Sequence, residues 1–97
     1  MTQTTRPRVF EAIDSERTYQ KLKWGTDEKN PVASYLTFMR YHMARAEELA
    51  STLHTHEEAL HQIRKVTALG VACMEEHGAP LRDLDSALLP LKPDGTK

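Results

Sequence analysis

The sequence has little cysteine and glycine, and it lacks long apolar runs. Cys73 is the only cysteine, so no disulfide can form within the chain, and its apolar neighbours suggest a small core residue. The four glycines are scattered, and no Gly-rich phosphate loop, nucleophile elbow or Cys-x-x-Cys is present. No apolar run approaches the roughly 20 residues of a membrane span, and the first residues lack the apolar segment of a signal peptide. We therefore expect a cytoplasmic protein without a membrane partner.

The chain also lacks a large net charge of either sign. Thirteen basic and fourteen acidic residues give a formal charge of -1, and both signs are spread along the sequence. Without a basic block to follow a phosphate backbone, we do not expect nucleic-acid binding. The 97 residues fit one domain. A chain of this size buries only roughly 65% of its unfolded surface, so its core is small and an oligomer would ease that shortage.

Apolar residues recur at helical spacing along most of the chain, and capping signals separate the segments. Pro7 suits a first helical turn, and Gly25 suits a left-handed cap. Asn30 and Pro31 fit an N-cap followed by the first helical position, and Gly78 fits the end of another helix. The pattern predicts four helices and two flexible tails: helices over 7–24, 31–53, 56–77 and 80–89, and tails over 1–6 and 90–97.

The segment over 56–77 has apolar residues around more than half of its circumference, after a possible capping box formed by Thr55 and Glu58. Such a wide apolar arc predicts two packing neighbours, one of which could belong to a second subunit. Gly70 costs about 1 kcal/mol relative to Ala inside a helix, so we expect another helix to approach closely there. The fold prediction is all-α: an N-terminal helix, a long antiparallel helical hairpin and a short C-terminal helix. Two hairpins are expected to dimerise into a four-helix bundle.

The end of the first helical segment carries the pattern Glu-Arg-x-x-Gln-x-x-Lys-Trp-Gly, formed by Glu16, Arg17, Gln20, Lys23, Trp24 and Gly25. An apolar helix start over 34–39 and a stretch of small and apolar residues over 66–75 follow. This order, over about residues 10–78, resembles the MazG-like group of all-α nucleoside triphosphate pyrophosphohydrolases, which includes small phage and prophage proteins. The resemblance implies a phage or prophage origin, a bacterial host cell and a homodimer.

The acids of that group are missing. Its enzymes carry Glu-Glu-x-x-Glu on one helix and a Glu-x-x-Asp pair on the next, because Mg²⁺ takes oxygen ligands. The corresponding positions in this chain are Tyr41, His42, Arg45, Gln62 and Lys65. We therefore expect no catalytic residue, metal or cofactor. The alternative is a pyrophosphohydrolase whose acids are relocated to Glu47 and Glu48, or to Glu57 and Glu58. Glu47 and Glu48 are adjacent, about 100° apart, and cannot both point inward.

The replacements permit a cationic and partly aromatic pocket that holds nucleotide phosphates without hydrolysis, as a sponge or sensor. The same residues could instead be solvated helix faces. Trp24 could stack on a base beside Tyr19, or it could anchor the first helix. The candidate ligand-binding residues are Tyr41, His42, Arg45, Arg64, Lys65, Tyr19 and Trp24.

Two further groups of polar residues suggest structural roles. Glu16 and Arg17 are expected to pair with charges across the helices, with Arg17 facing the interior. His54, His56 and His61 lie close in sequence but lack the further ligands of a zinc site, so we expect surface histidines. The leading hypothesis is a non-catalytic phage-derived binding protein whose partner is a host or phage protein, or a nucleotide.

Overall fold

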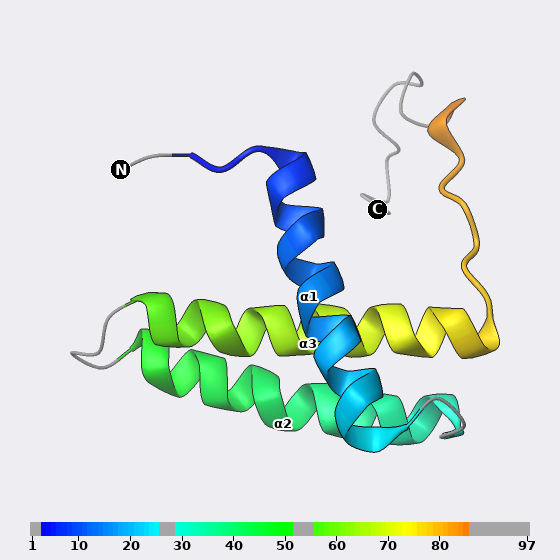
Figure 1. The fold of residues 1–97 in the computed structure, drawn as a ribbon, viewed down its shortest axis with the longest axis horizontal. Helices are drawn as coiled ribbons and strands as arrows, with labels where there is room; N and C mark the ends of the chain where they lie inside the picture. The colour runs from blue at the N-terminus through cyan, green and yellow to red at the C-terminus, as the bar shows by residue number, and fades with distance from the viewer. Residues whose placement is uncertain (1–2, 26–28, 52–55, 86–97) are drawn as a thin grey trace, which may run out of the picture.

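The computed structural model describes residues 3–25, 29–51 and 56–85. Within these ranges the chain forms three α-helices and no strand: α1 (Arg6–Trp24), α2 (Val32–Ala50) and α3 (His56–His77). The helices α2 and α3 run antiparallel and side by side, while α1 crosses the hairpin steeply and packs on α3 (Figure 1). The prediction of an all-α chain is confirmed. None of the described helices has the length and apolar character to cross a membrane.

The first helix begins and ends at local capping signals. Thr5 is its N-cap, and the Thr5 side chain accepts a hydrogen bond from the backbone N–H of Arg8 at 3.4 Å. The helix therefore begins at Arg6, one residue before the predicted start. At the other end, Gly25 donates its N–H to the Lys21 carbonyl at 2.8 Å and has φ 89°, where L side chains are strained. Its ψ of 163°, however, belongs to an extended conformation. The predicted left-handed cap is therefore wrong, although φ is positive.

The other helix ends also lie near their predicted positions. Pro31, rather than Asn30, is the N-cap residue of α2, so the helix begins one residue after the predicted start. Gly78 follows α3 as predicted, with φ 124°. Thr55 and the predicted end of the second helix over 52–53 lie outside the described residues.

The predicted C-terminal helix does not begin at Pro80. Residues 78–83 form no helix, and Leu84 and Asp85 form a short 3₁₀ turn. The rest of the predicted helix, and the predicted tail over 90–97, lie outside the described residues. Leu81 is 96% exposed and Leu84 is 74% exposed. A helix over 80–83 would gain no packing from these leucines, and short helices depend on such packing for their stability.

The core is small and lies between α2 and α3. Tyr35, Leu69 and Ala72 form its buried cluster, and Met39 and Cys73 pack against them. Cys73, predicted to be a core residue, is therefore a partly buried residue at the edge of this cluster. Many large apolar side chains of the hairpin remain 42% to 68% exposed: Val32, Leu36, Phe38, Tyr41 and Met43 on α2, and Leu60, Ile63 and Met74 on α3.

Gly70 lies inside α3 and faces Met39 of α2. A Cβ atom at Gly70 would lie 3.6 Å from the Met39 methyl carbon, which is an ordinary van der Waals distance. The close helix approach predicted from this glycine is not found among the described residues, because a flexible side chain fills the space. Glycine costs about 1 kcal/mol relative to alanine inside a helix, and among the described residues Met39 is the neighbour that occupies the space beside Gly70.

Candidate functional site

The first helix meets the hairpin through polar side chains. Its buried residues are Glu16 and Gln20, which are 6% and 2% exposed. By contrast, Phe10 is 60% exposed and Trp24 is 48% exposed. Because α1 crosses α3 steeply, its N-terminal half extends away from the hairpin (Figure 1). The half-exposed Trp24 is therefore not a fully buried anchor of α1.

Two ion pairs fix α1 on α3. The Nε atom of Arg64 donates to Glu16 at 2.7 Å, and the two side chains are 29% and 7% exposed. The Nε atom of Arg17 donates to Glu75 at 2.8 Å. The predicted pairing of Glu16 and Arg17 across the helices is thus confirmed. Removing Arg64 would leave a buried carboxylate without its partner, which is more costly than losing an exposed pair.

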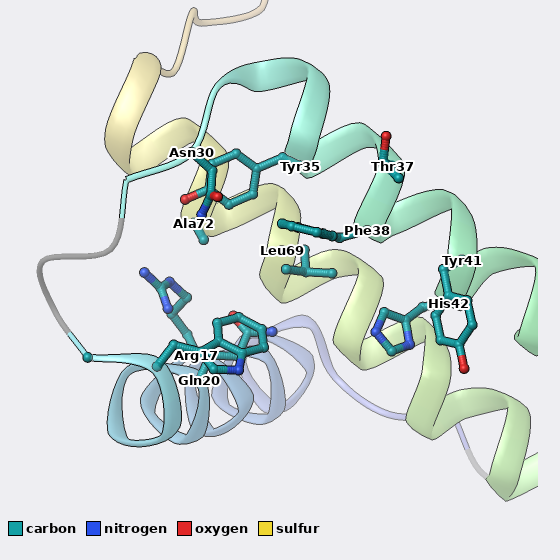
Figure 2. Close-up of a pocket in the computed structure, with 12 residues that line it drawn as sticks. Arg17, Gln20, Asn30, Tyr35, Thr37, Phe38, Tyr41, His42, Leu69 and Ala72 are labelled. Atoms are coloured by element: carbon teal, nitrogen blue, oxygen red, sulfur yellow. The ribbon is translucent and has the colours of Figure 1, made fainter.

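A cavity of about 400 Å³ lies between α1 and α2, beside α3. Figure 2 shows Arg17 and Gln20 of α1 across the cavity from Phe38, Tyr41 and His42 of α2. Leu69 and Ala72 of α3, together with Trp24, Gly25 and Asn30, also line the cavity. The volume lies within the range of roughly 300–1,000 Å³ that is typical of small-molecule pockets.

Gln20 lines this cavity, and its side chain carries an unpaired acceptor. Its side-chain oxygen Oε1 is buried and has no hydrogen-bond partner among the described residues. A buried acceptor without a partner costs about 1–3 kcal/mol, and few native structures keep one without a reason. The described part of the protein supplies no group that offsets this cost.

His42 is oriented by Gln62, and both occupy positions where the resemblance led us to look for carboxylates. The Nδ1 atom of His42 lies 2.9 Å from the amide oxygen of Gln62. An amide oxygen only accepts, so Nδ1 carries the proton and Nε2 of the neutral ring is an acceptor. The ring of Tyr41 packs edge-on against His42, with centroids 5.0 Å apart.

Glu76 holds the segment before α2 against the end of α3. Its carboxylate accepts the Asn30 backbone N–H at 3.1 Å and the Tyr35 hydroxyl at 2.9 Å. Burial opposes ionisation of Glu76, but the hydrogen bonds from Tyr35 and Asn30 outweigh it and lower the pKa. Burial also raises the pKa of Tyr35, and the hydrogen bond to Glu76 adds to that shift. These contacts position Asn30 and Tyr35, which both line the cavity.

Three of the predicted ligand-binding residues line this cavity, namely Trp24, Tyr41 and His42. Four others do not: Tyr19, Arg45, Arg64 and Lys65. Arg45 pairs with Glu48 at 2.6 Å on the exposed side of α2, while Arg64 is held by Glu16. The described structure therefore does not bring the predicted cations together in one pocket.

Sequence reasoning missed Gln20, Asn30 and Phe38 as lining residues. Gln20 lies three or four residues from Glu16, Arg17 and Trp24, a spacing typical of one side of a helix. That spacing does not indicate a cavity. Phe38 offered no signal beyond its place in an apolar helix start.

The acids of the alternative enzyme hypothesis lie on exposed positions. Glu47 and Glu48 are exposed on α2, and Glu57 and Glu58 are exposed in the first turn of α3. In the described ranges, no group of three or more histidine, cysteine or acidic side chains is placed to hold a metal ion. Among the histidines, His56 and His61 are exposed, and His54 lies outside the described residues.

Comparisons with protein-family models, curated proteins and solved structures found no match to this chain. The MazG-like resemblance therefore remains a hypothesis that depends on the sequence motifs alone.

The ionised form of Glu76 should stabilise the fold, and acid should remove that contribution. The folded pKa lies below the ordinary value of 4.5, so the contribution is complete above that pH and is lost as the pH falls through the folded pKa. We predict that Glu76→Gln lowers the Tm at about pH 7 and that the Tm values of the two proteins converge in acid, once the pH is below the folded pKa of Glu76. Glu47→Gln, at an exposed position on α2, is the control. An equal Tm difference at both pH values would contradict this role.

Proposed function

We propose that this chain is a non-catalytic binding protein and that the cavity between α1 and α2 is its ligand site. The observation that carries the proposal is a cavity of about 400 Å³ that combines aromatic side chains with the buried, unpaired Gln20 oxygen. Apolar pockets with a few convergent polar groups are the usual form of small-molecule sites. The MazG-like resemblance favours a nucleotide as the ligand, bound in the bacterial cytoplasm.

Binding without hydrolysis fits the residues that line the cavity. Hydrolysis of a nucleotide between its phosphates needs carboxylates that hold Mg²⁺ close to the ligand. The lining residues of the described chain include no aspartate or glutamate. A hydrolase would have to use acids on another surface, such as Glu47 and Glu48, and that remains the alternative function.

Fluorescence titration tests the proposal, because Trp24 is the only tryptophan and lines the cavity. We predict that nucleotides change its emission with the same affinity in Mg²⁺ and in a chelator. At a hundredfold excess over Kd, the ligand should add about 2.7 kcal/mol to the free energy of unfolding. Tyr41→Ala should weaken binding at least about tenfold, as expected for loss of a stacking residue. The exposed control Arg45→Ala should leave the affinity unchanged.

Two results would contradict this function. Magnesium-dependent release of pyrophosphate would favour the alternative enzyme, and its loss in Glu47→Gln would identify the relocated site. No change in Trp24 emission or in Tm with any nucleotide would exclude a nucleotide ligand. A host or phage protein would then be the remaining partner.

We also propose that two hairpins associate into a four-helix bundle through a shallow groove along α2 and α3. Leu36, Met43 and Val66 give the groove an apolar base, and Arg40 and Glu47 lie on it as well. Arg40 and Glu47 are about two helical turns apart, on the same side of α2. If two α2 helices pack antiparallel around a two-fold axis near Met43, each Arg40 faces Glu47 of the other copy. A self-complementary face of this kind suits a symmetric dimer.

Charge reversal tests the dimer. We predict that the protein sediments as a dimer and that Arg40→Glu raises the dimer Kd at least about tenfold, because like charges then face each other. Adding Glu47→Arg should restore the affinity of the wild type. Arg45→Glu, on a different side of α2, is the matched control. A wild-type monomer at tens of micromolar, or no rescue by the double reversal, would contradict this arrangement.

A further inference from the structure

We infer that the cavity recognises an uncharged planar heteroaromatic ring through its N–H donors and that phosphate groups add nothing to the affinity. This inference rests on the proposed ligand site and names the part of the ligand that the site binds. It follows from three properties of the lining, namely its aromatic side chains, its hydrogen-bond acceptors and its single neutralised cation.

Aromatic side chains line the cavity from both of its main sides. Trp24 comes from α1, and Phe38 and Tyr41 come from α2. Aromatic side chains pack well against the faces and edges of flat rings. Trp24 is 48% exposed and Tyr41 is 68% exposed, so both retain surface that a ligand can cover. These features favour a planar ligand over a flexible aliphatic one.

The polar groups of the cavity include two acceptors. Gln20 contributes the buried oxygen that lacks a partner, and His42 contributes Nε2, because its Nδ1 donates to Gln62. The terminal torsion of a glutamine is soft, so the oxygen of Gln20 can turn toward a donor in the cavity. A ligand N–H at this position would supply the missing partner. A ligand edge that carries only acceptors would leave the Gln20 oxygen unpaired.

The charges in the lining argue against phosphate as the recognised group. Arg17 is the only arginine or lysine among the described residues of the lining. Its Nε donates to Glu75 at 2.8 Å, so the carboxylate already neutralises it. A phosphate entering the cavity would have to compete with Glu75 for this cation. The cavity therefore suits a ring better than a phosphate tail, because the arginine that a phosphate would need is already paired with Glu75.

The test compares ligands that differ in one group, with Trp24 emission and calorimetry as readouts. The probes are adenosine, cytidine, guanosine, their triphosphates, N6,N6-dimethyladenosine and inorganic tripolyphosphate. We expect at least one nucleoside to bind within about threefold of its triphosphate, and tripolyphosphate not to bind. If adenosine binds, its dimethyl derivative should bind at least about tenfold more weakly, because its N–H donors are gone.

The outcomes separate this inference from the proposed function. A triphosphate that binds more than tenfold tighter than its nucleoside would overturn the inference and leave the nucleotide site in place. Full affinity of the dimethyl derivative would also overturn the inference, because the donors would then play no part. If no nucleoside and no triphosphate binds, both proposals fail.

Gln20→Met tests the assigned residue. Methionine keeps the length of the side chain and removes the acceptor, so we expect at least a tenfold loss of nucleoside affinity. The Tm of the free protein should stay equal or rise, because an unpaired buried acceptor has been removed. Tyr19→Leu, at an exposed position of α1 outside the cavity, should change neither quantity. Unchanged affinity with a lower Tm would show that the Gln20 oxygen has a structural role only.

Discussion

The ion pair between Glu16 and Arg64 is the contact on which the position of α1 depends. It joins a carboxylate that is 7% exposed to the middle of α3, while the apolar side chains of α1 at Phe10 and Leu22 are mostly exposed. The helix therefore has no apolar seam along which it could lie parallel to the hairpin. Polar contacts over its middle turns hold it across α3 instead (Figure 1). This crossing leaves the space between α1 and α2 that forms the cavity.

The hairpin supplies the buried apolar cluster, whereas α1 supplies part of the cavity lining. The buried cluster of Tyr35, Leu69 and Ala72 belongs entirely to the hairpin, which can gain most of the hydrophobic stabilisation of the fold. The first helix contributes Gln20 and Trp24 to the cavity and little to the core. Buried ion pairs often add little net stability but can fix one arrangement over others. In this protein, the pair would select the orientation of α1 that creates the proposed ligand site.

The helices were predictable because their boundaries depend on local chemistry. Gly25 and Gly78 end helices at positive φ, which is a property of a few neighbouring residues. The pairing of Glu16 and Arg17 was also predictable, because two charges beside an inward-facing stripe need partners. The exposure of Phe10 and Trp24 was not predictable, because it follows from the angle at which α1 crosses α3. Sequence periodicity identifies which side of a helix packs against its neighbour, but it does not say how far along the helix that contact extends.

The proposed site was only partly predictable for a similar reason. Tyr41 and His42 were found because they replace the acids of the resembling group. Arg45 and Arg64 were expected beside them, but each lies close to a glutamate that the sequence could not assign to it. The burial of the Gln20 oxygen depends on how α1 packs against the rest of the chain, which no local pattern reports. The predictable part was therefore Trp24, Tyr41 and His42, and the missed part included Gln20, Asn30 and Phe38.

The most direct test of the role of this ion pair is a double-mutant cycle on Glu16→Gln and Arg64→Met. The quantity measured for each variant is its free energy of unfolding. We predict that Arg64→Met alone destabilises the protein by about 2 kcal/mol, because Glu16 stays buried without its partner. The double variant should be less destabilised than the sum of the single variants, with a coupling of about 1 kcal/mol or more. A coupling near zero would contradict the claim that this ion pair holds α1 on the hairpin.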